Sequence, residues 1–189
     1  MASVLDDPAI SLARLTVAQY HQMVKGGVLL DGDPLELFEG VLGEKLSEGP
    51  AHSFRISQIA RLLIRSLGNA GWQVRVQNPI TTDDSEPEPD LAIVVDLDYS
   101  QRHPGGADVS VVIEVAGSSL VRDRSTKQRM YANADIAQYV IINLVDSTIE
   151  SYTEPHGGDR ARYGRHETLT AGMMALGPVT VDIASLLGN

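Results

Sequence analysis

Apolar runs of strand length occupy the middle of the chain. Trp72–Gln77, Leu91–Val95 and Val109–Val115 are rich in β-branched side chains, which fit the pleated surface of a sheet. Tyr139–Leu144 and Thr148–Tyr152 have the same character, and the short polar segment between them predicts a hairpin. The centre of the chain therefore predicts a β-sheet.

Helical patterns bracket these strands. Across Pro50–Leu67 apolar residues recur every three or four positions, so one face of this helix is expected to be buried. Asp123 fits the N-cap of a second helix that runs to about Ala134. A capping-box pattern at Thr16–Gln19 predicts a short helix that ends near Lys25.

The remaining segments complete an α/β pattern. Leu35–Phe38 and Val41–Leu46 predict a β-hairpin, and a last strand with a helical turn is expected from Val179. Residues 1–14 are expected to form a tail. The order α, ββ, α, βββ, α, ββ predicts one α/β domain over residues 15–189, with a mixed central sheet flanked by helices.

Composition limits the classes of protein. No apolar run approaches the length of a membrane span, and the N-terminus has no apolar core of a secretory signal. The chain of 189 residues has no cysteine, which excludes disulfides and thiolate metal sites and fits a cytoplasmic protein. Its net charge of −10 argues against tight non-specific binding to nucleic acid, because such binding depends on cations that neutralise phosphates.

Two acidic residues accompany the central strands. Glu114 shares a strand face with Val112 and Ala116, where a carboxylate is costly unless it meets a metal, a cation or several donors. A salt bridge to an arginine of a covering helix is the simpler alternative. Asp90 follows two prolines that hold its approach extended, and it is equally typical of a turn residue at a strand edge.

Lys127 and His52 occupy positions that face the core in the predicted helices. Lys127 shares the apolar stripe of its helix, where an ammonium requires an anionic partner, although a surface pair with Asp123 is the alternative. His52 lies four residues before Ile56 on the buried face, a place typical of a structural histidine. No Walker A, GxGxxG, HExxH or GxSxG sequence is present.

In this order and spacing, several segments together resemble the Uma-two family of restriction-endonuclease-like proteins, within the PD-(D/E)XK nuclease superfamily. The likeness covers nearly the whole chain. Its segments are RLTVAQYHQMV at Arg14, LELFEGVL at Leu35, GPAHSFRISQIARLL at Gly49, VQNPI at Val76, SEPEPDLAIV at Ser85, RHPGG at Arg102 and VVIEVAGSSLVRDRSTKQRMYANADIAQYVIINL at Val111.

The resemblance implies a site and a reaction. Asp90 becomes the motif aspartate and Glu114 the glutamate of the ExK position, while Ala116 stands where that motif has lysine and Lys127 replaces it from the next helix. The two carboxylates and the carbonyl of Val115 would hold Mg²⁺ or Mn²⁺ for cleavage of DNA, with a homodimer presenting two sites. His52 would contact a phosphate or brace the site.

Two points of the resemblance stay open. The family commonly has an acid after the glycine of the hairpin, where this chain has Val41, so a ligand role for Glu36 or Glu39 is in doubt. A non-catalytic binding module that keeps the fold is the alternative, consistent with the acidic charge. Convergence of arginines on the site would favour the nuclease; they are Arg122, Arg124 and Arg129 beside Lys127, and Arg55, Arg61 and Arg65 on the other helix.

Overall fold

A mixed sheet of six strands forms the centre of the molecule. The computed structural model describes residues 9–30, 32–45 and 49–188. The strands lie in the order β3-β4-β5-β6-β7-β8, and every neighbouring pair is antiparallel except β5 with β6. Their bounds are Trp72–Val76, Leu91–Val95, Val109–Ala116, Gln138–Asn143, Thr148–His156 and Arg162–Leu169 for β3 to β8.

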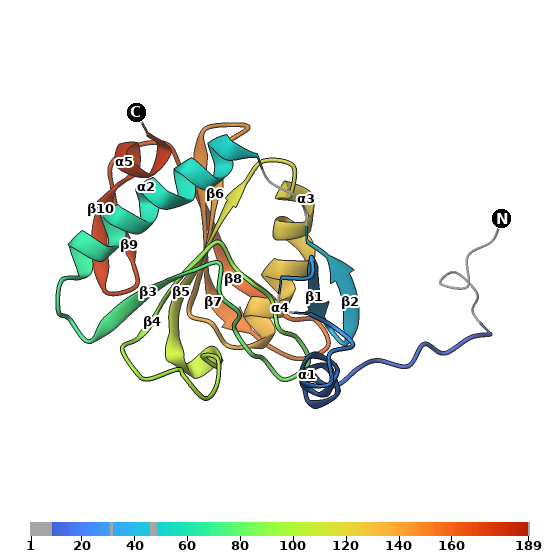
Figure 1. The fold of residues 1–189 in the computed structure, drawn as a ribbon. Helices are drawn as coiled ribbons and strands as arrows, with labels where there is room; N and C mark the ends of the chain where they lie inside the picture. Colours follow the sequence, from blue (N-terminus) through green and yellow to red (C-terminus); the bar gives the residue numbers. More distant parts are fainter. Residues whose placement is uncertain (1–8, 31, 46–48, 189) are drawn as a thin grey trace.

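Helices cover both faces of this sheet, and two hairpins lie beside it (Figure 1). One face carries α2 and α5, and the other carries the continuous helical segment α3-η3-α4. The hairpin strands are β1 (Leu35–Phe38) with β2 (Val41–Glu44) and β9 (Met173–Leu176) with β10 (Val179–Asp182). The helices are α1 (Val17–Lys25), α2 (Pro50–Leu67), the 3-10 turn η2 (Gly106–Asp108), α3 (Leu120–Arg122), the π-helix η3 (Asp123–Lys127), α4 (Gln128–Asn133) and α5 (Ile183–Leu187).

The parallel pair explains why a helix stands over the middle of the sheet. Antiparallel strands connect through tight turns, but a parallel partner requires a crossover that returns the chain to the starting edge. Here α3-η3-α4 forms that crossover between β5 and β6. The crossover starts directly after β5, so its first turns lie above the carboxyl end of that strand.

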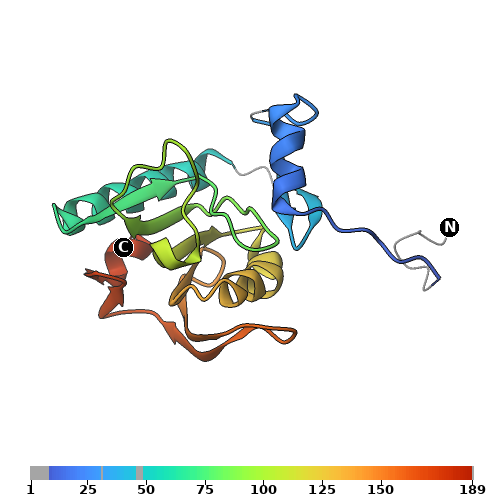
Figure 2. The same cartoon turned by 90° about the horizontal axis from the view of Figure 1, so that it is seen from below.

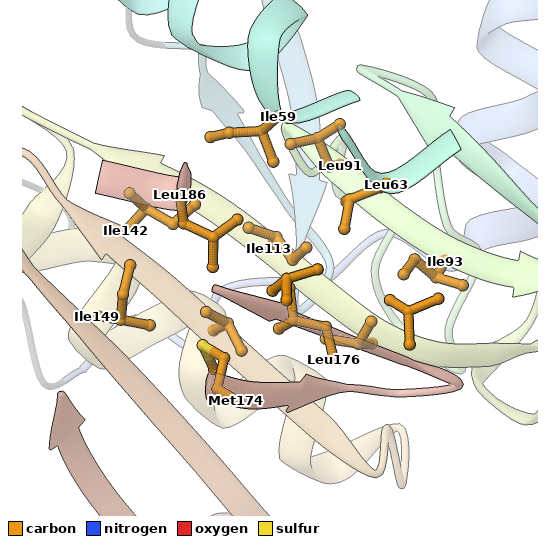
Figure 3. Packing of buried hydrophobic residues seen from close by; sticks show 14 of the residues in the cluster. Ile59, Leu63, Leu91, Ile93, Ile113, Ile142, Ile149, Met174, Leu176 and Leu186 are labelled. Atoms are coloured by element: carbon orange, nitrogen blue, oxygen red, sulfur yellow. The ribbon is translucent and has the colours of Figure 1, made fainter. Parts of the chain in front are cut away.

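An apolar core fills the face covered by α2 (Figure 3). The helix contributes Ile59 and Leu63, and the central strands contribute Leu91, Ile113 and Ile142, all buried. The β9–β10 hairpin and α5 close this core from the side with further aliphatic residues. The apolar stripe predicted for Pro50–Leu67 is confirmed, and it is buried against the sheet.

The opposite face is packed with aromatic residues that carry hydroxyl groups. Tyr131, Tyr139, Tyr152 and Tyr163 form a connected group of rings, with centroids 5.0 to 6.3 Å apart. Each buried hydroxyl needs a partner, and the Tyr139 hydroxyl donates to the carbonyl of Asp123 at 3.2 Å. This face is therefore buried like the first, but it contains polar groups.

The α/β class and the mixed sheet with helices on it are confirmed. The predicted hairpin is present as β1 and β2, although the last predicted residue, Leu46, lies outside the described residues. Two strands were not predicted, β8 and β9, and β7 continues to His156. The prediction stopped at Tyr152 because the following residues are polar, whereas pairing with β8 extends the strand.

The N-terminal helix α1 stands apart from the main body (Figure 2). Thr16 and Gln19 form the predicted capping box at its start. None of its side chains is buried, and residues 9–14 lead from it away from the body. A pair between His21 and Glu86, 2.6 Å apart, joins the helix to the body. In the part of the chain that the structure describes, no helix is long and apolar enough to cross a bilayer.

Candidate active site

Asp90 and Glu114 lie on neighbouring strands at one end of the sheet. Asp90 directly precedes β4, and the register between β4 and β5 places it beside Glu114. The Asp90 amide donates to Glu114 Oε2 at 3.4 Å, and Asp90 Oδ2 accepts from the Val115 amide at 2.8 Å. The two acids that the sequence singled out are therefore adjacent in space.

Lys127 reaches these carboxylates from the crossover helix. Its Nζ donates to Glu114 Oε1 at 2.8 Å, and only 3% of Lys127 is exposed. The Tyr131 hydroxyl donates to the same oxygen at 2.9 Å. Lys127 is therefore buried and does not form the alternative surface pair with Asp123. The cation that pairs with Glu114 is this lysine and not an arginine of a covering helix.

Asp123 is not the N-cap of the crossover helix, so that prediction is wrong. The helix begins at Leu120, and Asp123 opens the π-helical turn η3 inside it. Asp123 is 1% exposed, and it lies close enough to Lys127 to affect its pKa. π-turns occur frequently at functional sites, because the wider turn redirects side chains. Asp123 is a site residue that sequence reasoning missed.

Glu36 is a second acid that the sequence left in doubt. It lies on β1, is 4% exposed, and its Oε2 accepts from the Glu88 amide at 3.2 Å. It lines the same pocket as Lys127. Its place within LELF gave little signal, because adjacent side chains of a strand face opposite sides. Glu39 instead pairs with Arg129 at 2.6 Å, outside this pocket.

Three buried acids, Glu36, Glu114 and Asp123, act on the ammonium of Lys127. Burial raises the pKa of Glu114 to about 8; Lys127 opposes that shift and Asp90 adds to it. Burial also raises the pKa of Glu36 and of Asp123. Burial disfavours the charged form of Lys127, but the carboxylates of Glu114, Glu36 and Asp123 outweigh burial and raise its pKa. The pocket therefore favours a bound cation.

His52 braces the end of β5 from the first turn of α2. Its Nε2 lies 2.6 Å from the carbonyl of Val115 and 3.2 Å from Asp90 Oδ2. The backbone of Val115 thus contacts Asp90 through its N–H and His52 through its carbonyl. A histidine on the buried face of α2 was predicted, and its position ties the helix to the site.

A polar pocket of about 310 Å³ is lined by Glu36, His52, Asp90, Glu114 and Lys127. Arg122 and Lys45 also line it. The other arginines named in the sequence do not line it: Arg129 pairs with Glu39, Arg124 pairs with Glu150, Arg55 donates to the carbonyl of Leu187, and Arg61 and Arg65 lie exposed on α2. The cationic lining of the pocket is therefore small.

The acids of the pocket form a candidate metal site with two carboxylates. In residues 9–30, 32–45 and 49–188, no three His, Asp or Glu side chains are grouped as a complete metal cage. Asp90 and Glu114 supply two adjacent carboxylates, and the Val115 carbonyl has a second lone pair beyond the one facing His52. This hard, oxygen-only set fits Mg²⁺ or Mn²⁺ with water at the remaining positions.

Comparison with known proteins gives the family. The Uma2 family model, described as "Putative restriction endonuclease", matches residues 17–184. The chain belongs to the Uma2 family. A search of curated protein sequences found no match.

A solved structure shares the fold of this Uma2 protein. It is described as the crystal structure of "a putative nuclease belonging to DUF820" from Anabaena variabilis. The match has a TM-score of 0.70 and covers 92% of this chain and 98% of that chain, at 13% sequence identity. At this identity, the likeness shows the fold alone.

Proposed function

We propose that the protein is a divalent-metal-dependent nuclease that hydrolyses phosphodiester bonds in DNA. One observation carries the proposal: Asp90, Glu114 and Lys127, from three different elements, meet in one pocket that holds more acids than cations. Membership of a family described as restriction endonucleases agrees with this chemistry.

Asp90, Glu114 and the Val115 carbonyl would hold Mg²⁺ or Mn²⁺. When bound, the metal lowers the pKa of a coordinated water and neutralises charge on the phosphate oxygens. The chain's own contribution is orientation: the Val115 N–H fixes Asp90, and Tyr131 with Lys127 fixes Glu114.

Lys127 supplies the positive charge that stays in the site throughout the reaction. The surrounding carboxylates raise its pKa, so the ammonium remains protonated at neutral pH. A fixed ammonium stabilises charge that develops on a phosphate oxygen without reorganisation at the moment of reaction. His52, held at the Val115 carbonyl, braces Asp90 at the opposite side.

The function is tested with purified protein on supercoiled, linear and single-stranded DNA. With Mn²⁺ or Mg²⁺ we expect cleavage that weakens at high salt, because so acidic a protein must bind DNA through a small cationic area. Asp90→Asn and Glu114→Gln should each lower the rate by about 10³-fold or more, since losing a ligand costs several kcal/mol. Glu167→Gln removes an exposed carboxylate and is the matched control.

Metal binding separates the roles of the residues. Calorimetric titration with Mn²⁺ should show weaker binding for Asp90→Asn and Glu114→Gln, whereas Lys127→Ala should keep the metal and slow the chemistry. Equal cleavage by all three variants would place the activity elsewhere or in a contaminant. A homodimer would present two sites to the two strands of a duplex, and sedimentation velocity measures that state directly.

The second candidate is a non-catalytic binding module with the nuclease fold. One observation favours it: of the six arginines whose convergence would favour the nuclease, only Arg122 lines the pocket. This module predicts neither Mn²⁺ binding nor cleavage by the wild-type protein. A wild-type protein that is inactive but binds Mn²⁺ would keep the metal site and leave the substrate to be found.

A further inference from the structure

The edge strand β3 leads away from the catalytic pocket. Gln77 follows β3, and its amide donates to the carbonyl of Asp90 at 3.1 Å. Gln77 lines both the catalytic pocket and a larger cleft of about 1320 Å³. Val74 and Val76 pack on the apolar core, so Arg75 points to the opposite face, which is the face of Glu114. It lies about 7 Å from Gln77 along the strand.

Tyr99 holds two guanidinium groups beside this path. The Arg75 guanidinium lies 5.4 Å from the centroid of the Tyr99 ring, and that of Arg102 lies 5.3 Å from it. The Tyr99 hydroxyl donates to the carbonyl of Val95 at 3.0 Å, which anchors the ring to the end of β4. Tyr99 and Arg102 both line the large cleft. The sequence shows none of this, because the three residues meet only through strand pairing and the following loop.

Arg75 and Arg102 stack on the same ring but differ in their other partners. Arg102 is paired with Asp108 at 2.5 Å. Arg75 donates to Asn78 Oδ1 at 3.2 Å, and within the described part of the chain it forms no ion pair with a carboxylate. The chain has 25 acidic residues and 15 Lys and Arg residues, so carboxylate partners are abundant. A partly exposed guanidinium that lacks one is available to an external anion.

We propose that Arg75, held on Tyr99 beside Arg102, binds the phosphate backbone of the nucleic-acid strand where it leaves the catalytic pocket along β3. The inference rests on the proposed nuclease function. A planar guanidinium recognises a phosphate with two parallel hydrogen bonds, and stacking on a ring reduces the freedom it loses on binding. The strip formed by Arg75, Tyr99 and Arg102 gives an acidic protein a local site for an anionic polymer.

The test is equilibrium binding of a fluorescein-labelled 20-nucleotide strand and of its duplex, measured by anisotropy in EDTA so that no cleavage occurs. Arg75→Gln should weaken binding about tenfold at low salt. It should also reduce the slope of log affinity against log salt by about 0.7 to 0.9, the share of one phosphate. Arg75→Lys should keep that slope. Arg65→Gln, the same charge change at an exposed position of α2, is the control and should change neither quantity.

Thermal melting of each variant shows that loss of binding is not loss of fold. If Arg75→Gln and Arg65→Gln had equal effects, or if the wild-type protein did not bind, the proposed phosphate binding at Arg75 would be wrong. Those outcomes would not decide the nuclease proposal. That proposal is tested separately by metal-dependent cleavage and its loss in Glu114→Gln, which do not involve Arg75. Conversely, an inactive wild-type protein with an Arg75-dependent salt slope would overturn the nuclease and keep the strip.

Discussion

The two faces of the central sheet are equally buried but differ in chemistry. The face under α2 is packed with aliphatic side chains from the helix, the strands and the C-terminal hairpin. The face under α3-η3-α4 contains tyrosine hydroxyls, carboxylates and an ammonium. One strand, β5, serves both faces: Ile113 points to the first and Glu114 to the second. The difference teaches that one strand can place an aliphatic core on one side and a cluster of buried charges on the other.

Removal of the buried ammonium should give the largest effect. Lys127→Met leaves Glu36, Glu114 and Asp123 without their shared cation, and breaking a buried pair from one side typically costs about 3–5 kcal/mol. We expect that loss in the free energy of unfolding at pH 9, and a smaller loss at pH 5, where carboxyls with raised pKa values hold protons. Denaturant titration at the two pH values measures it.

The control for that variant is Lys25→Met, which removes an exposed lysine from α1 and should change stability little. Added Mn²⁺ should restore part of the stability of Lys127→Met, since a metal cation replaces the lost charge. A loss independent of both pH and metal would mean that Lys127 acts by packing alone.

A large-to-small substitution on the other face should give a loss of a different kind. Ile113→Ala creates a cavity in the aliphatic core and should cost about 3 kcal/mol of unfolding free energy. Because no charge is involved, the loss should be the same at pH 5 and pH 9 and should not respond to Mn²⁺. Val121→Ala, at an exposed position, is the control. A strong pH dependence in Ile113→Ala would show that the faces are coupled.

The third prediction concerns the pH dependence of the metal-free protein. The pKa of Glu114 is raised from 4.5 to about 8, so between these values the folded state binds more protons than the unfolded state. Stability from this group is therefore present at low pH and declines as pH rises toward about 8. Glu114→Gln cannot ionise, so it should flatten the decline, measured as the melting temperature from pH 5 to pH 9. An equally steep decline in Glu114→Gln would assign it to other groups.

The smallest effect is expected at the rim of the polar face. Arg124 donates three hydrogen bonds to the buried carboxylate of Glu150, which also accepts from Tyr152 and Asn143. Burial opposes ionisation of Glu150, but these donors outweigh it and lower its pKa. Arg124 is nearly half exposed, so Arg124→Gln should cost only about 1 kcal/mol at pH 7.

The stability that Glu150 contributes depends on pH in the opposite direction to that of Glu114. A carboxyl group whose pKa is lower in the folded state stabilises the protein at pH values above its pKa in the unfolded state. That stabilisation is lost as the pH falls through its pKa in the folded state. The difference between Arg124→Gln and the wild-type protein should therefore shrink in acid. Arg165→Gln, in an exposed pair with Glu167, is the control and should cost less at every pH.

The sequence indicated candidate site residues where a charged residue interrupts an apolar pattern. Lys127 lies on an apolar stripe and Glu114 in an apolar strand, so both positions indicated buried partners. Asp123 gave no such signal, because an aspartate before a helical pattern reads as an N-cap whether or not the helix has already begun. Glu36 sits in a strand of only four residues, where alternation carries little information. Contacts that depend on strand pairing, such as the one between Arg75 and Tyr99, can be predicted only when the register of the sheet is known.

The backbone of Val115 makes two contacts of the site through the two peptide groups that flank its α-carbon. Its side chain is anchored in the aliphatic core, while its N–H contacts Asp90 and its carbonyl faces His52. The alignment of the site is therefore encoded in the main chain at this residue and not in the identity of the side chain. Val115→Ile should therefore keep both backbone contacts, and any loss should come only from packing in the core. Divergent relatives are then expected to keep the arrangement of the site while their sequences around it become hard to align.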